Sequence, residues 1–216
     1  MKTSKPSARS FGPFVNVFRV QVRQLIAWGY ENVCRRARCN SEEEPAITGF
    51  ITEAINDLLR APGCPSWSVH YSVHEDPPVE KEGVSGKSRP RPDMIIEANF
   101  EGRPQYIFEA KRLRKGGYGV DKYVGSAGMG CFISGLYASR YVEAAMLGYV
   151  QSDSPAQWKD VIKEAIDRRG NSLRLVPPQR DVIVIDAFPL EWCSEHQRDK
   201  AGYPITIYHL LLNCCT

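Results

Sequence analysis

Residues 92–113 read PDMIIEANFEGRPQYIFEAKRL, and this stretch is the most informative part of the sequence. Two apolar runs rich in strand-forming residues, expected as strands over 93–100 and 105–113, flank a short turn-forming segment at 99–104. Strands joined by so short a connection pair in antiparallel fashion. The stretch therefore predicts a β-hairpin.

The hairpin brings two acids and a lysine to one surface. Glu109 and Lys111 share a strand face because side chains alternate along a strand. The expected register places Asp93 opposite about Ala110, and a shift of one residue brings Asp93 beside Glu109 or Lys111. Two carboxylates this close repel unless a cation lies between them, and Mg²⁺ typically takes one or two protein carboxylates and completes its shell with water and phosphate oxygens. Lys111 would position the attacking water and stabilise developing negative charge.

A helix acid is expected to complete this group. Residues 41–60 are predicted to be helical, with Ser41 opening a capping box before an apolar stripe. At 100 degrees per residue, Glu44 lies on the inward face, Glu43 at its edge, and Glu53 points away. Glu44 could then hold a metal-bound water or a second ion, although an acid in a first turn also suits the helix dipole.

The remaining pattern predicts an α/β chain with a mixed central β-sheet flanked by helices. Its expected parts are a disordered tail over 1–12, an N-terminal helical extension over 13–40 and a main domain over 41–216. The extension contains a helix at 13–36 whose arginines form a solvated face or, as the alternative, contact phosphates. Within the main domain we expect a strand at 66–74, a long loop at 75–91, a mobile glycine-rich loop at 115–130, helices at 135–151 and 155–169, and strands at 180–188 and 205–212.

Composition sets the cellular context. A chain of 216 residues that is 43% hydrophobic can bury one domain's core, and a net charge of +3 neither demands nor excludes a polyanion. Seven cysteines without a regular spacing are expected as reduced thiols in a cytoplasmic protein. No apolar run has the length of a signal peptide or a membrane span, so no membrane partner is expected. Cys34, Cys39 and Cys64 with His70 or His74 lack the paired short spacings of a zinc site.

The motifs resemble those of the PD-(D/E)xK nuclease superfamily, which has the restriction-endonuclease-like fold. The match consists of Pro92-Asp93, then Glu109-Ala110-Lys111 at the end of the next strand, with Glu44 as the best fit for the upstream helix acid, and it covers about residues 41–113. The resemblance implies an αβββαβ core and hydrolysis of nucleic-acid phosphodiesters, usually DNA, with Mg²⁺ as cofactor or Mn²⁺ in its place. It also implies that Asp93, Glu109 and the Ala110 carbonyl are metal ligands, that Lys111 is catalytic, and that defence or mobile-element biology is the usual context.

Basic and aromatic residues surround the motif. Phosphate contacts are expected from Arg91, Arg112, Arg114 and Lys115, with Tyr118 and Tyr123 available in the glycine-rich loop, and a solvated charged rim is the alternative. Specificity would come from loops, from a homodimer mate or from a partner protein. Two other functions stay open: a non-catalytic nuclease-fold subunit that binds within a nucleic-acid complex, and an enzyme that acts on RNA.

Overall fold

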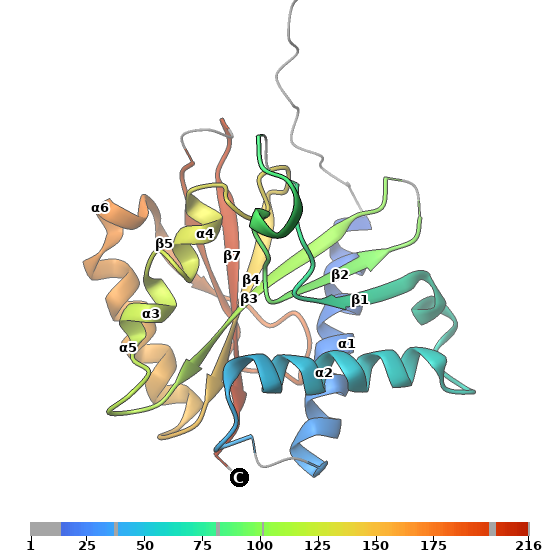
Figure 1. The fold of residues 1–216 in the computed structure, drawn as a ribbon. Helices are drawn as coiled ribbons and strands as arrows, with labels where there is room; N and C mark the ends of the chain where they lie inside the picture. Colours follow the sequence, from blue (N-terminus) through green and yellow to red (C-terminus); the bar gives the residue numbers. More distant parts are fainter. Residues whose placement is uncertain (1–13, 37–38, 81–82, 101, 199–201, 216) are drawn as a thin grey trace, which may run out of the picture.

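A mixed β-sheet forms the middle layer of the molecule (Figure 1). The computed structural model describes residues 14–36, 39–80, 83–100, 102–198 and 202–215, and within them seven strands pair in the order β1-β2-β3-β4-β7-β6-β5. The strands are β1 Tyr71–Glu75, β2 Met94–Ala98, β3 Gln105–Leu113, β4 Glu143–Val150, β5 Leu175–Asp181, β6 Trp192–His196 and β7 Ile205–Asn213. The expected tail at 1–12 lies outside the described residues.

Strand directions divide the sheet into three parts. β1, β2 and β3 form an antiparallel meander, β4 and β7 continue it in parallel with β3, and β6 and β5 complete it in antiparallel fashion. The helices are α1 Phe14–Arg36, α2 Glu44–Arg60, α3 Val120–Val124, α4 Met129–Ile133, α5 Pro155–Arg168 and α6 Gly170–Leu173, with 3₁₀ turns at Ser66–His70 and Gly86–Ser88. From α2 to β4 the order is helix, three strands, helices, strand, which confirms the predicted α/β class with a mixed sheet.

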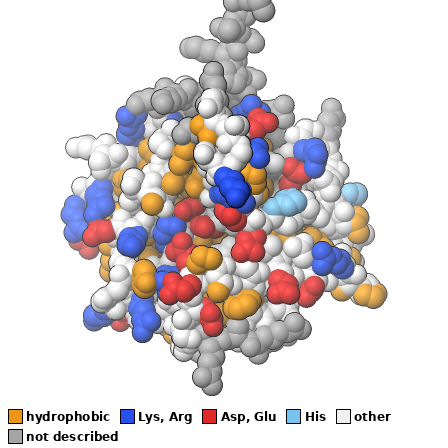
Figure 2. Space-filling model, in the orientation of Figure 1, with side chains coloured by type: hydrophobic (Ala, Val, Ile, Leu, Met, Phe, Trp, Pro, Cys, Tyr) orange, Lys and Arg blue, Asp and Glu red, His pale blue; other side chains and the backbone are white. Residues whose placement is uncertain are grey.

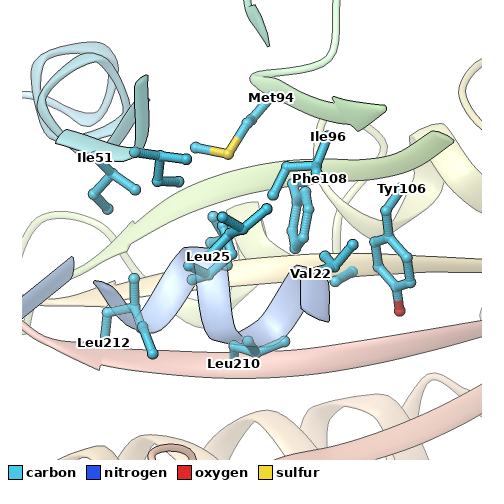
Figure 3. Packing of buried hydrophobic residues seen from close by; sticks show 14 of the residues in the cluster. Val22, Leu25, Ile51, Met94, Ile96, Tyr106, Phe108, Leu210 and Leu212 are labelled. Atoms are coloured by element: carbon cyan, nitrogen blue, oxygen red, sulfur yellow. The ribbon is translucent and has the colours of Figure 1, made fainter. Parts of the chain in front are cut away.

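Helices α1 and α2 cover one face of the sheet and share a single core with it. Val22 and Leu25 of α1 pack with Ile51 of α2 against Phe108 and Leu210 of the strands (Figure 3). Full burial of an aliphatic or aromatic side chain stabilises the fold by about 1.5–3 kcal/mol. Residues of α1 and α2 thus belong to the same hydrophobic cluster.

Two arginines of α1 correct the expectation of a solvated basic face. Arg23 is fully buried, with Nε 2.8 Å from Glu191 Oε1 and a second nitrogen donating to the Tyr106 hydroxyl at 2.9 Å. Arg19 pairs with Glu143 at the start of β4. Both side chains tie α1 to the sheet, because a charge in the interior must be paired with another.

Helices α3, α4 and α5 cover the other face, above a network of buried imidazoles. The Ser194 hydroxyl lies 2.9 Å from His209 Nε2 and 2.8 Å from His196 Nε2, and His196 Nδ1 lies 2.7 Å from the Leu173 carbonyl oxygen. Burial lowers the pKa of His196 to about 4. Both rings are fully enclosed, so the neutral form is the one that this core accommodates.

The prediction of a helix over 135–151 is wrong. Its second half is β4, a strand buried along nearly its whole length, so it shows no polar alternation that would mark it as a strand. Gly148 permits the close approach of its neighbours, since a Cβ there would lie 2.5 Å from Leu211 Cδ2 and 2.7 Å from Leu113 Cδ1. The small residues that suggested helix packing serve strand packing instead.

Other boundaries also differ from the expected ones. The first half of the strand expected at 66–74 is a 3₁₀ turn, and the glycine-rich segment expected as a loop at 115–130 contains α3 and the start of α4. Of the strand expected at 180–188, only the first two residues belong to β5, and β6 follows unpredicted. In contrast, α1, α5 and β7 confirm their predictions. Among the described residues, no helix is long and apolar enough to cross a membrane.

Candidate active site

The site lies where β3 continues past the end of β2. β2 pairs with β3 only as far as Met94 opposite Phe108, and this register, extended by one residue, places Asp93 opposite Glu109. The predicted opposite residue was Ala110, so the expected register was one residue off. Beyond this point, no described strand pairs with the edge of β3 that faces β2.

Carboxylates take the place of the missing strand. The Ala110 amide donates to Asp93 Oδ2 at 2.6 Å, and the Arg112 amide donates to Glu44 Oε2 at 3.0 Å. Buried amides require acceptors, and a carboxylate is a strong one. The open edge of β3 therefore fixes the positions of both acids.

Lys111 connects all the groups predicted to bind a cation. Its Nζ lies 2.8 Å from Glu109 Oε1, 3.0 Å from Glu44 Oε1 and 3.9 Å from Asp93 Oδ2, and it also donates to the Ala110 carbonyl oxygen. The ammonium thus occupies the point on which these oxygens converge. Three carboxylates face a single ammonium, so the group carries an excess of negative charge.

Burial makes this excess costly. Glu109 is 6% exposed, and its Oε2 is buried without a hydrogen-bond partner among the described residues. Burial raises the pKa of Glu109 to about 8, and the nearby Asp93 carboxylate adds to the shift. Burial also raises the pKa of Asp93, whereas the pKa of Lys111 rises because Glu109, Glu44 and Asp93 outweigh its burial. A further positive charge would relieve the cluster.

The glutamates of the helix point in the directions that their sequence positions predict. Glu44 reaches β3, whereas Glu43 is the N-cap residue, with its side chain 72% exposed and paired with the Arg112 guanidinium. Glu53 is exposed on the far face. The predicted capping box at Ser41 is wrong, because α2 begins at Glu44 and the cap makes no side-chain hydrogen bond.

The predicted phosphate-contact residues lie in different surroundings. Arg112 is buried, and its guanidinium lies 3.8 Å above the Tyr118 ring centroid. Arg91 pairs with Asp76 at 2.7 Å, and Arg114 and Lys115 are exposed just past the end of β3. Arg114 and Lys115 are thus better placed for a polyanion than Arg112 is.

Tyr123 corrects another expectation, since it is fully buried and its hydroxyl lies 3.1 Å from His209 Nδ1. It belongs to the core and cannot contact a base. Figure 2 shows acidic and basic side chains interspersed over the middle of the visible face, without a continuous basic surface.

A metal ion would have to use few protein ligands here. Among the described residues, no group of three or more His, Cys, Asp or Glu side chains is arranged to hold one. Asp93, Glu109 and the Ala110 carbonyl oxygen provide two carboxylates and a neutral oxygen, a set that suits Mg²⁺ because this ion retains several waters. The unpartnered Glu109 Oε2 is the feature that such an ion would satisfy. The donor set therefore fits Mg²⁺, or Mn²⁺ in its place.

Residues of α4 and of the segment after it lie beside the site, and sequence reasoning missed them. The Tyr137 hydroxyl donates to the Arg91 carbonyl oxygen at 2.9 Å, which holds this segment against the residues that lead to Asp93. Burial raises the pKa of the Cys131 thiol to about 11, with the negative charge of Glu109 contributing. No local pattern marks these residues, because only the tertiary fold brings them to Glu109.

No protein-family model, no curated protein and no solved structure matches the chain.

Proposed function

We propose that this chain is a Mg²⁺-dependent nuclease that hydrolyses phosphodiester bonds of nucleic acid, with DNA as its expected substrate. One observation carries the proposal: Asp93, Glu109, Glu44 and the Ala110 carbonyl all converge on the Lys111 ammonium. A cluster of acids with a deficit of positive charge at the end of a strand is suited to binding a divalent cation and a phosphate. The resemblance to the PD-(D/E)xK motifs supports the same reading.

Bound Mg²⁺ would supply an activated water and neutralise charge on the phosphoryl group. Asp93 and Glu109 would hold it, together with the Ala110 carbonyl oxygen. The Lys111 ammonium would hydrogen-bond the attacking water and stabilise charge that develops on phosphorus. Glu44 would orient Lys111, since its Oε1 accepts from Nζ while its Oε2 is fixed by the Arg112 amide.

Exposed basic residues suit the approach of the substrate. Arg114 and Lys115 follow β3 directly, so they lie close to Lys111 along the chain and contact solvent. Phosphate contacts of this kind position a nucleic acid without reading its sequence. A role in defence or mobile-element biology, acting as a homodimer or with a partner protein, belongs to the proposal by analogy with the family.

A cleavage assay tests the proposal. Supercoiled plasmid, linear duplex, single-stranded DNA and RNA are incubated with Mg²⁺ or Mn²⁺, and wild type is compared with Asp93→Asn, Glu109→Gln and Lys111→Met. Glu53→Gln is the matched control, because it neutralises an exposed acid on the far face of α2. We expect cleavage by wild type and Glu53→Gln, and loss of cleavage with EDTA or in the other three variants.

Two results would contradict the proposal. Cleavage that survives the Asp93 and Lys111 substitutions would place the activity elsewhere, in a contaminant or a different site. Tight binding of nucleic acid without cleavage of any substrate would favour the non-catalytic subunit.

A further inference from the structure

A cavity of about 450 Å³ adjoins the candidate active site. Its floor is formed by Ile95 and Ile107, which pair in register across β2 and β3. Its walls come from the loop at 77–80 and from the segment at 136–141, which follows α4. This volume is within the range of small-molecule binding sites.

The cavity and the carboxylates share one face of the sheet. Cross-strand pairs on that face recur every second residue, so the Ile95–Ile107 pair follows Asp93 and Glu109 directly. A strand rises about 3.3 Å per residue, which places the floor of the cavity about 7 Å from the carboxylate pair. That distance corresponds to about one step along an extended nucleotide chain.

The lining suits a flat heterocycle. Ile95, Ile107 and Leu136 present apolar surface to the cavity, and polar side chains, among them His74, Gln105 and Arg140, share its lining. There Gln105 is fixed, since its Nε2 donates to Glu97 Oε2 at 2.6 Å and its Oε1 accepts from the Tyr141 hydroxyl at 3.2 Å. A nucleobase has apolar faces and a polar edge, so it suits a cavity that combines an apolar floor with oriented polar groups.

The rim carries a positive charge that can turn toward a phosphate. Arg140 pairs with Glu80 across the two walls, with an N–O distance of 3.2 Å and side chains 76% and 80% exposed. An ion pair this exposed contributes little to stability, so a phosphate could replace Glu80 at low cost.

We infer that this cavity holds the base of the nucleotide next to the scissile phosphate, and that the substrate is single-stranded at this point. The inference rests on the proposed function, because the Asp93–Glu109 pair defines which phosphate is scissile. A base inside a duplex is stacked and paired, so it would have to be extruded before it could enter a cavity at the side of the sheet. A single strand meets no such cost.

An abasic scan tests the inference. Single-stranded oligonucleotides of one sequence, each lacking the base at a different position, are cleaved with Mg²⁺ by wild type and by Leu136→Trp, which fills the cavity. Val161→Trp is the control, because it adds the same side chain to the exposed face of α5. We expect one position beside the cut to matter most in wild type, with cleavage about tenfold slower when its base is missing. In Leu136→Trp that position should no longer matter, whereas Val161→Trp should behave like wild type.

The outcomes separate this inference from the proposed function. Cleavage that is indifferent to every missing base, or equally position-dependent in Leu136→Trp, overturns the inference and leaves the nuclease assignment standing. Faster cleavage of duplex than of single strand also overturns it. If no substrate is cut, the nuclease proposal fails. Binding of the same oligonucleotides, measured by fluorescence anisotropy in EDTA, then tests whether the cavity holds a base. Position-dependent loss of affinity, abolished in Leu136→Trp, then supports base binding, and its absence refutes it.

Discussion

Replacement of Lys111 by methionine should strengthen metal binding while it lowers kcat. Methionine fills similar space but removes the ammonium, which lies 2.8–3.9 Å from oxygens of Glu109, Glu44 and Asp93. The variant therefore has three carboxylates without a counter-charge. A divalent ion would then meet stronger attraction and no neighbouring positive charge.

The size of the effect follows from Coulomb's law. If the ion and the ammonium would lie about 4 Å apart, a double and a single charge repel by about 2 kcal/mol in a water-like dielectric. Removal of that repulsion corresponds to about 30-fold tighter binding. The dielectric of water makes this value a minimum, because the side chains of Lys111 and Glu109 are only 12% and 7% exposed. Loss of charge stabilisation should at the same time lower kcat by about 10²- to 10³-fold.

Calorimetric titration with Mn²⁺ measures the affinity, and thermal unfolding with and without Mn²⁺ measures the coupling to stability. The metal-free variant should unfold at a lower temperature than metal-free wild type. Added Mn²⁺ should raise the unfolding temperature of the variant by more than it raises that of wild type. Lys163→Met is the control, since Lys163 also pairs with a carboxylate, that of Asp181, but stands on α5. A folded Lys111→Met variant that binds Mn²⁺ no better than wild type would refute the reasoning.

Three further predictions concern single interactions. Glu44→Gln should lower the cleavage rate by at least about tenfold while Glu43→Gln stays near wild type, because only Glu44 contacts Lys111; equal rates in the cleavage assay would contradict this. Arg23→Met should lower the free energy of unfolding, measured with urea, by about 3–5 kcal/mol, because it leaves the buried Glu191 unpaired. A second substitution, Glu191→Met, should restore much of this free energy. The folded-state pKa of His196 is about 4, below its ordinary value, so its contribution to stability is complete above about pH 6.5 and is lost as the pH falls toward 4. The free energy of unfolding, measured with urea, should decline by about 2 kcal/mol between about pH 7.5 and about pH 5, and the decline should shrink in a folded His196→Gln variant.

The hairpin and α2 were predictable because their side chains repeat with the period of their backbone. Alternation placed Glu109 and Lys111 on one face, and a rotation of 100 degrees per residue distinguished Glu44 from Glu53. The register was off by one residue, since it depends on the conformation of the turn rather than on the hydrophobic pattern alone. Local periodicity thus predicted which residues converge, and tertiary packing set their spacing.

Strand β4 shows where local pattern stops being informative. A strand that pairs on both edges and is covered on both faces needs small and apolar residues throughout, and such a run also suits a buried helix. The prediction for the arginines of α1 was wrong for a related reason. Arg23 was expected at the surface because arginine usually is, and its partner Glu191 is distant along the chain and could not be identified without the fold.

The open edge of β3 gives a single physical cause for the arrangement of the site. Amides that emerge past the end of β2 need acceptors, and those of Ala110 and Arg112 donate to the acids Asp93 and Glu44. Those acids retain further oxygen lone pairs, and the side chain of Glu109 from the same strand adds a third carboxylate beside them. Because an amide oxygen can accept the same backbone hydrogen bonds, Asp93→Asn and Glu44→Gln should preserve the geometry of the edge while they remove charge. Such variants therefore separate the two roles of these acids: if they fold and bind nucleic acid but lose metal affinity, charge rather than strand-edge capping is what the chemistry requires.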